Sequence, residues 1–325
     1  IMTGAPVPPG ANAVVIKEKV VVHQESNTFW IEVTEPVSCH ANIRFMGEDV
    51  AANAMVADAG VGVTPARLSL LASSGYSEVE VHQAPKIAII ASGSELVPMG
   101  QKPQPHQIVN SNAHAVGAVL QSAGAEVQIL GIAPDTLKAH AKLLNEAAEA
   151  DLVVTIGGVS MGEKDWVRPA LESIGAKQVF WKVAMRPGKP LVFAKREQQL
   201  FVGLPGNPVS ALVGAELFLL PMIRKFMGQR NIFTQPFYAT LGNKTPLKKR
   251  ADFMTFFRAH LSIRQERFEV IALTKQSSGQ ISGLAESNAL LVTPVGPNII
   301  HPGAVLQVLP LSSTILQPTT SLSPS

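Results

Sequence analysis

Apolar and polar positions follow different periods along this chain, and the period changes twice. Residues 1–41 carry short alternating runs, AVVIKEKVVVH and TFWIEVTEPVS, which predict a small antiparallel β module whose N-terminal part is missing. Residues 42–84 predict a mixed connecting or dimer-forming region, with one short helix, ARLSLLASSG, that ends at Gly75. Ile1 is not an initiator residue, so we expect the N-terminus to be truncated.

Between residues 85 and 233, short apolar runs alternate with amphipathic segments. This alternation predicts a parallel sheet with helices on both faces, which is a doubly wound α/β domain. The predicted strands read KIAIIAS, EVQILGI, DLVVTIG, QVFWKVA, PLVFAK and QLFVGL. The predicted helices cover residues 113–123, 136–150, 167–174 and 208–227, the last with Asn207 as N-cap and Pro208 at its first position.

After residue 233 the pattern returns to strands. The runs FYATLGN, DFMTFFRAHLSI, RFEVIALT, ALLVTPV and VLQVLPL predict a small β domain over residues 234–311. Residues 312–325 are rich in Ser, Thr and Pro, which predicts a disordered tail. The fold class is therefore α/β, with a doubly wound domain between an N-terminal β or mixed region and a small C-terminal β domain.

Composition narrows the classes of function. At 325 residues, the chain is too long for one ordinary domain. A net charge of +3 is too weak for a general nucleic-acid footprint, and neither a membrane span nor a leader sequence is evident, so we expect a cytoplasmic protein without nucleic-acid or membrane partners. Cys39 is the only cysteine, which excludes an internal disulfide and a multi-thiolate metal site.

Small and charged residues gather at the ends of the predicted strands, where open α/β sheets bind their ligands. These residues are Glu95, Asp135, Gly157, Gly158, Ser160, Gly162, Asp165, Lys182, Arg186, Lys189, Pro205, Asn207 and Pro208. The backbone N–H groups of the Gly-rich turns, with Arg186 and Lys189, suit phosphate or another oxyanion. The carboxylates imply Mg²⁺ between the protein and a phosphate-bearing substrate, with Glu95 and Asp165 as its ligands.

Several of these signals also have a purely structural interpretation. GGVSMG matches neither the NTPase nor the dinucleotide fingerprint, and a Gly-rich loop can be a tight turn. Asp135 can cap the helix that follows it, Glu95 can be a solvated loop acid, and Lys182 can extend toward solvent. Asp165 has no evident capping role and is the strongest single candidate. Convergence of all these loops on one edge of the sheet favours a shared site.

The segments IMTGAPVP, RFMGEDV, ASGSEL, GGVSMGEKD, MRPGKP and GLPGNPVSA stand in the order and approximate spacing of the molybdopterin molybdenumtransferase (MoeA-type) family. The chain resembles this family up to about residue 310, although GGVS-G--D alone is shared with molybdopterin adenylyltransferases. The resemblance implies an enzyme that takes molybdate and adenylylated molybdopterin, hydrolyses the adenylate and leaves the metal on the dithiolene, assisted by Mg²⁺. It also implies a homodimer, with a molybdopterin adenylyltransferase as a candidate partner.

The resemblance assigns roles to particular residues. Catalytic roles fall on Thr3, Asp49, Glu95, Asp135, Asp165 and Lys182, while Ser160, Arg186, Lys189, Pro205 and Pro208 fall at further functional positions. By alignment, Arg258 and Ser278 join Arg186 and Lys189 around molybdate. The chain departs from the family where Ser94 replaces an acid, where RFMGED replaces the more basic RRRGED, and where the Asp-rich motif that precedes IMTGAP in the family is absent.

Two other functions compete with this one. A molybdopterin adenylyltransferase uses the same α/β domain, but IMTGAP and the flanking β domains argue against it. A non-catalytic scaffold, as in gephyrin-like proteins, requires an appended N-terminal domain or linker that the sequence does not show, and an inactive fragment is the remaining alternative. We therefore expect the molybdenum-inserting transferase.

Overall fold

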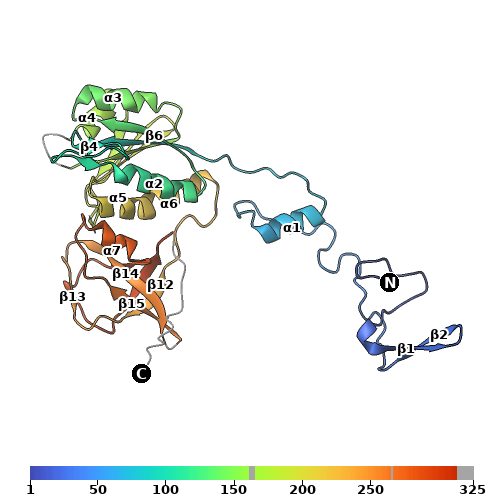
Figure 1. The fold of residues 1–325 in the computed structure, drawn as a ribbon. Coiled ribbons are helices and arrows are strands. Elements are labelled where there is room, and N and C mark those ends of the chain that lie inside the picture. The colour runs from blue at the N-terminus through green and yellow to red at the C-terminus, as the bar shows by residue number, and fades with distance from the viewer. Residues whose placement is uncertain (161–164, 265, 313–325) are drawn as a thin grey trace. The chain divides into compact units, whose positions relative to one another are not determined.

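The computed structural model describes residues 1–160, 165–264 and 266–312, and the chain divides into two compact units, residues 1–79 and 80–325 (Figure 1). In the first unit, η1 (Lys17–Lys19) leads into the antiparallel hairpin of β1 (Val20–Glu25) and β2 (Thr28–Val33). Helix α1 (Pro65–Ser73) begins after Thr64, whose hydroxyl accepts a hydrogen bond from the Arg67 N–H. Leu71 is the only buried side chain in this unit, so residues 1–79 have almost no core of their own.

A six-stranded sheet forms the first part of the second unit. Its strands, in spatial order, are β6 (Glu126–Ala133), β3 (Lys86–Ser92), β7 (Leu152–Ile156), β11 (Gln199–Leu204), β10 (Val192–Arg196) and β8 (Lys177–Trp181). Strands β3, β6, β7 and β11 are parallel, as predicted, but β10 is antiparallel to both of its neighbours. The prediction of a wholly parallel sheet is wrong at β10 because only Glu197 and Gln198 link it to β11, and so short a link joins antiparallel strands only.

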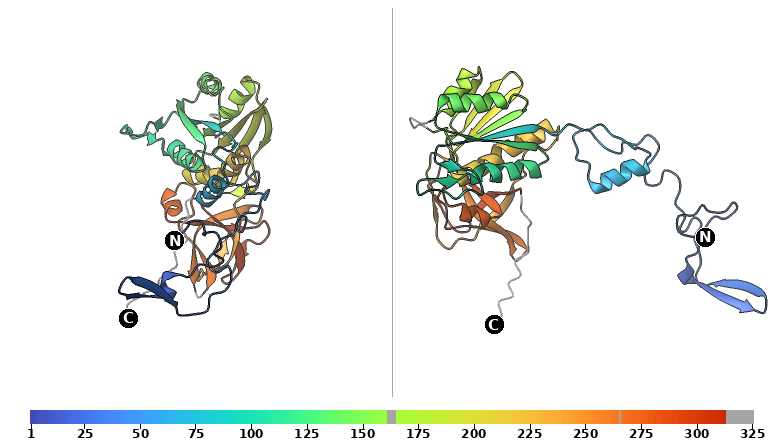
Figure 2. Two further views of the ribbon diagram at one scale, coloured as in Figure 1. Left: turned by 90° about the vertical axis from the view of Figure 1, so that its right-hand side faces the viewer. Right: turned by 45° about the horizontal axis from the view of Figure 1, so that its top comes forward.

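Helices cover both faces of this sheet (Figures 1 and 2). One face carries α2 (Ser111–Ser122) and a continuous helical segment made of α5 (Pro208–Gly214), the π-helical η2 (Ala215–Leu219) and α6 (Leu220–Phe226). The other face carries α3 (Leu137–Glu146) and α4 (Val167–Ser173). The doubly wound arrangement is therefore confirmed, and a short parallel pair, β4 (Leu96–Val97) and β5 (Ile108–Val109), follows β3.

The C-terminal part is a small β domain, as predicted. Its sheet runs in the order β15 (Arg267–Ala272), β12 (Phe237–Leu241), β18 (Val305–Pro310), β16 (Ala289–Thr293), β14 (Met254–Arg264) and β9 (Met185–Arg186). Strand β15 also pairs with β14, which closes the five C-terminal strands into a barrel-like ring. The elements α7 (Ile281–Ala285), β13 (Leu247–Lys248) and β17 (Ile299–Ile300) complete the domain.

Strand β9 joins the two parts of the second unit. It follows β8 in the chain, yet it pairs with β14 of the C-terminal domain, with Met185 opposite Met254 and Arg186 opposite Thr255. A shared apolar core surrounds this junction and includes Met185, Val209 of α5 and Leu284 of α7. The sequence predicted only a loop here, because a two-residue strand has no readable period.

Two of the predictions fall outside the described residues. These are Gly162 and, apart from Ser312, the C-terminal tail over residues 312–325. Within the part of the chain that the structure describes, the helices are too short or too polar to cross a membrane.

Candidate functional site

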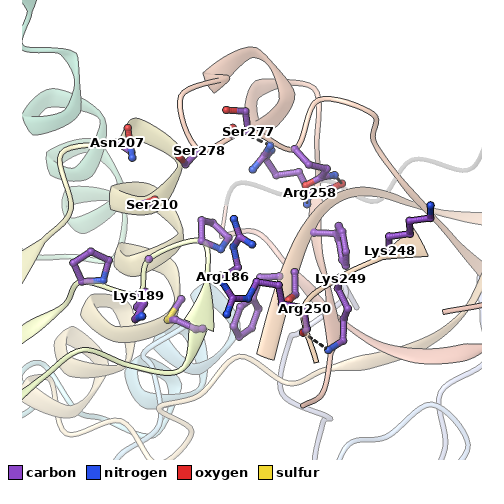
Figure 3. Close-up of a pocket in the computed structure, with 18 residues that line it drawn as sticks. Arg186, Lys189, Asn207, Ser210, Lys248, Lys249, Arg250, Arg258, Ser277 and Ser278 are labelled. Atoms are coloured by element: carbon purple, nitrogen blue, oxygen red, sulfur yellow. Dashed lines mark hydrogen bonds between the residues drawn. The ribbon is translucent and has the colours of Figure 1, made fainter. Parts of the chain in front are cut away.

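A cavity of about 460 Å³ lies where the α/β domain meets the C-terminal domain, and we call it the junction pocket (Figure 3). Six cationic side chains line it: Arg186, Lys189, Lys248, Lys249, Arg250 and Arg258. No acidic residue is present among the described residues of its wall. Uncharged polar residues complete the wall: Asn207, Ser210, Thr255, Gln276, Ser277 and Ser278. Such an excess of positive charge favours an anionic ligand.

Arg258 is the most constrained of these cations, because its side chain is fully buried in β14. Its Nε donates a hydrogen bond to the Lys275 carbonyl at 3.0 Å, and its Nη2 donates to the carbonyls of Lys275 and Ser277. Its Nη1 is buried and has no hydrogen-bond partner among the residues that the structure describes. Burial lowers the pKa of Arg258, and an unpaired buried donor is costly. An anion in the junction pocket would satisfy both the charge and the free N–H.

Arg186 and Lys189 are placed by the backbone between β8 and β10. Pairing of β9 with β14 fixes Arg186, and Gly188 has a φ of 102°, which favours glycine. A Cβ at Gly188 would lie 3.1 Å from the Met185 Cε atom. Arg186 and Lys189 therefore lie on one tight turn, and they line the same pocket as Arg258 and Ser278. The family resemblance implied this grouping.

Asn207 of the α/β domain and Ser278 of the C-terminal domain both line this pocket. Asn207 is the N-cap residue of α5 and Pro208 stands at the first helical position, as predicted, but the Asn207 side chain makes no capping hydrogen bond. It lines the junction pocket instead. The Val209 N–H donates to the Ser278 carbonyl at 3.1 Å, which ties the start of α5 to the C-terminal domain. Pro205, just before this turn, is buried.

A second cavity of about 750 Å³, which we call the loop pocket, includes Ser160 and Asp165 in its wall. Trp181, at the end of β8, also lines it, and the Trp181 Nε1 donates to the Val159 carbonyl at 3.1 Å. The guanidinium of Arg168 lies 4.0 Å from the Trp181 ring centroid, and the Lys182 Nζ lies 3.8 Å from it. The predicted site residues thus line two pockets, because the chain after β8 turns to the C-terminal domain and carries Arg186 and Lys189 with it.

The turn after β7 leaves no room for side chains. Gly157 and Gly158 have φ values of 93° and 66°, and Cβ atoms there would lie 2.6 Å from the Ser92 carbonyl oxygen and the Ser92 Oγ. Ser92 in turn is hydrogen bonded to the buried His140, with 2.8 Å between Oγ and Nε2. This support beneath the Gly-rich loop was not predicted, because Ser92 and His140 lie far apart in the sequence.

Glu95 and Asp135 follow β3 and β6, at the same edge of the sheet. Thr136, and not Asp135, caps α3 through its side chain, so the capping interpretation of Asp135 is wrong. The Asp135 N–H donates to the Ser94 Oγ at 3.0 Å. Neither acid lines the two pockets. Across residues 1–160, 165–264 and 266–312, no cluster of three or more His, Cys, Asp or Glu is placed to hold a metal ion.

Thr3 and Asp49 are exposed residues of the first unit. Sequence reasoning did not include Lys248, Lys249, Arg250, Ser210 or Gln276, which line the junction pocket. The basic run KKR just before the strand DFMTFF was the one signal that pointed to part of this set.

Comparison with known proteins agrees with this arrangement. Three family profiles match: "MoeA N-terminal region (domain I and II)" over residues 1–75, "Probable molybdopterin binding domain" over residues 88–225, and "MoeA C-terminal region (domain IV)" over residues 240–311. The fold is similar to the crystal structure of a molybdopterin biosynthesis MoeA protein from Pyrococcus horikosii, with a TM-score of 0.75, 24% identity, and coverage of 94% of this chain and 73% of that one. The chain thus has the fold of this structure, with an α/β domain that matches the molybdopterin-binding profile and a C-terminal β domain after it.

Curated relatives specify the family further. The chain is 36% identical over 314 residues to the molybdopterin molybdenumtransferase of Haemophilus influenzae, covering 96% of this chain and 76% of the relative. It is 32% identical over 310 residues to the protein of that name from Staphylococcus aureus strain MRSA252, covering 95% and 73%. The chain belongs to the molybdopterin molybdenumtransferase family, and the resemblance carried by its sequence motifs is confirmed.

Proposed function

We propose that this protein inserts molybdenum into molybdopterin, converting molybdate and adenylylated molybdopterin into molybdenum cofactor and AMP. The observation that carries the proposal is the junction pocket, where Arg258 is one of six cations and its buried Nη1 has no hydrogen-bond partner among the described residues. Family membership supports the same activity and does not favour the adenylyltransferase or scaffold alternatives.

Molybdate binds in the junction pocket. A tetrahedral dianion requires several N–H and O–H donors from different directions. Arg186 and Lys189 supply them from the α/β domain, and Arg258 and Ser278 supply them from the C-terminal domain. The pocket is built from both domains, so the oxyanion would be held at the junction itself.

The organic substrate binds along the Gly-rich loop, with Ser160 and Asp165 in the loop pocket and the backbone of Gly157 and Gly158 beside its phosphates. Mg²⁺ needs only one or two carboxylates from a protein when substrate phosphates and water complete its coordination. Glu95 and Asp165 would hold it, and Mg²⁺ would neutralise charge on the phosphoryl group. Asp135 and Lys182 complete the proposed catalytic set at this edge.

The protein acts as a cytoplasmic homodimer in which Thr3 and Asp49 complete the partner's site. Residues 1–79 support this proposal, because apolar side chains such as Phe29 and Trp30 are exposed in this unit, and exposed apolar surface favours association with another surface. A molybdopterin adenylyltransferase supplies the adenylylated substrate.

Two substitutions test whether molybdate binding and AMP release depend on different residues. Lys189→Ala removes a charge-assisted hydrogen bond and should weaken molybdate binding by roughly ten- to a hundredfold while sparing adenylylated molybdopterin. Asp165→Asn should spare molybdate and abolish Mg²⁺-dependent release of AMP. Calorimetric titration with each ligand, with AMP release measured in parallel, checks both expectations. Equal loss of both ligands in both variants would show that the two roles are not separable.

A further inference from the structure

The segment between β13 and β14 carries an ion pair at the edge of the junction pocket. The Arg250 Nε donates to the Asp252 Oδ1 at 3.0 Å, and the Arg250 Nη2 donates to the Asp252 Oδ2 at 2.7 Å. Both side chains are largely exposed. Arg250 lines the pocket, whereas Asp252 does not belong to the wall. Asp252 therefore engages a pocket cation from outside.

Phe253 connects this ion pair to the other side of the pocket. Its ring is buried, the Arg250 guanidinium lies 4.9 Å from the ring centroid, and the Lys189 Nζ lies 5.3 Å from the same centroid. One aromatic ring thus holds a cation from the C-terminal domain and a cation from the α/β domain. Arg250 and Arg186 both line the pocket (Figure 3).

Asp252 interacts electrostatically with both cations, Arg250 and Lys189. Its pKa is lowered, first by the hydrogen bond from Arg250 and further by the charges of Arg250 and Lys189. An ion pair this exposed contributes little to stability, so Arg250 can exchange Asp252 for another anion at small cost. An oxyanion that reaches Lys189 would offer Arg250 that second partner.

Lys249 has a different role, although it lines the same pocket. Its Nζ donates to the carbonyl of Arg250 at 3.0 Å and to the carbonyl of Phe253 at 3.2 Å. These bonds hold the backbone of residues 250–253 in a turn and thereby position the Arg250 Cα atom. Lys249 therefore stabilises the segment, and Arg250 is the cation whose partner can change.

We propose that Arg250 is an additional oxyanion-binding residue and that Asp252 competes with the oxyanion for it, thereby setting the affinity of the junction pocket. This inference rests on the proposed function for the identity of the oxyanion as molybdate. A competing role for Asp252 can be distinguished from a structural role, because removal of a competitor strengthens oxyanion binding, whereas removal of a structural support weakens it.

Calorimetric titration at low ionic strength tests the proposal with molybdate, tungstate, sulfate and phosphate as probes. Asp252→Asn should lower the Kd of the oxyanion that binds best by about two- to fivefold, and Arg250→Ala should raise it by about three- to tenfold. In the Arg250→Ala background, Asp252→Asn should gain less than about twofold. Thermal unfolding of each variant verifies that the fold is retained.

Glu146→Gln is the matched control, because Glu146 pairs with Lys142 on the surface of α3 and its loss removes one negative charge away from the pocket. It should leave the Kd unchanged. Unchanged or weaker binding by Asp252→Asn, or an equal gain with and without Arg250, would overturn the inference. A preference of the wild-type protein for phosphate over molybdate would count against the proposed function. The comparison of wild type, Asp252→Asn, Arg250→Ala and the double variant would still decide whether Asp252 competes for Arg250. Failure to bind any oxyanion would overturn both.

Discussion

Arg258 shows how much a single residue can reveal about the ligand of a pocket. A buried guanidinium normally has a carboxylate partner, because desolvating an unpaired charge is costly. Two nitrogens of Arg258 donate to backbone carbonyls, and the third has no hydrogen bond within the described part of the chain. The missing partner is the strongest residue-level indication that an anion belongs in the junction pocket.

Gly157 gives a prediction about stability at the same scale. A Cβ at this position would lie 2.6 Å from a backbone oxygen of Ser92, which cannot move aside as a side chain would. Gly157→Ala should therefore cost the strain of its positive φ, about 1–3 kcal/mol, together with a steric clash. Gly175→Ala is the control, because Gly175 has a similar φ of 79° and open space around its Cβ position. The melting temperature should fall further for Gly157→Ala, and equal losses would contradict the clash.

At the scale of elements, the π-helical η2 places a carboxylate where it is poorly solvated. Glu216 accepts hydrogen bonds from the Ser312 N–H and Oγ, yet burial raises its pKa despite these bonds. Because its folded pKa lies above its unfolded value, its contribution to stability is fully present at low pH and is lost as the pH rises through the folded pKa.

Glu216→Gln should remove this pH-dependent cost. The melting temperature of the variant relative to wild type should rise between pH 4 and pH 8, because a glutamine at this position does not ionise and so avoids the unfavourable burial of a carboxylate. Parallel scans of Glu146→Gln, which lacks this burial, should show no such trend. A relative loss of stability at pH 8 would mean that the bonds from Ser312 require the charge.

At the scale of the whole second unit, the junction couples stability to binding. Met185 is buried in the core that the two domains share, and it contacts the turn that carries Lys189. Met185→Ala should cost about 2–5 kcal/mol of stability through the cavity that it leaves, and it should also weaken oxyanion binding. Leu144→Ala, in a separate core beneath α3, should cost stability without weakening binding. Equal effects of both variants on the Kd would show that the junction does not position the pocket.

The sequence by itself determined much of the local structure and the family. Alternation at period two and period 3.6 predicted the strands and helices of the α/β domain, because burial of one face imposes that period on each element. It also identified Arg186, Lys189, Arg258 and Ser278 through motifs, since their spacing along the chain is characteristic even where their contacts are unknown.

Only the tertiary structure decided which of these residues share a pocket. Pairing of β9 with β14 moves Arg186 and Lys189 away from Ser160 and Asp165 and brings them to Arg258, and no local pattern encodes a two-residue strand that joins a distant sheet. The antiparallel β10, the contact of Ser92 with His140 and the ion pair beside Lys189 depend in the same way on long-range packing. Short-range periodicity reports which face of an element is buried, whereas the partners across that face are set by the free energy of the whole fold.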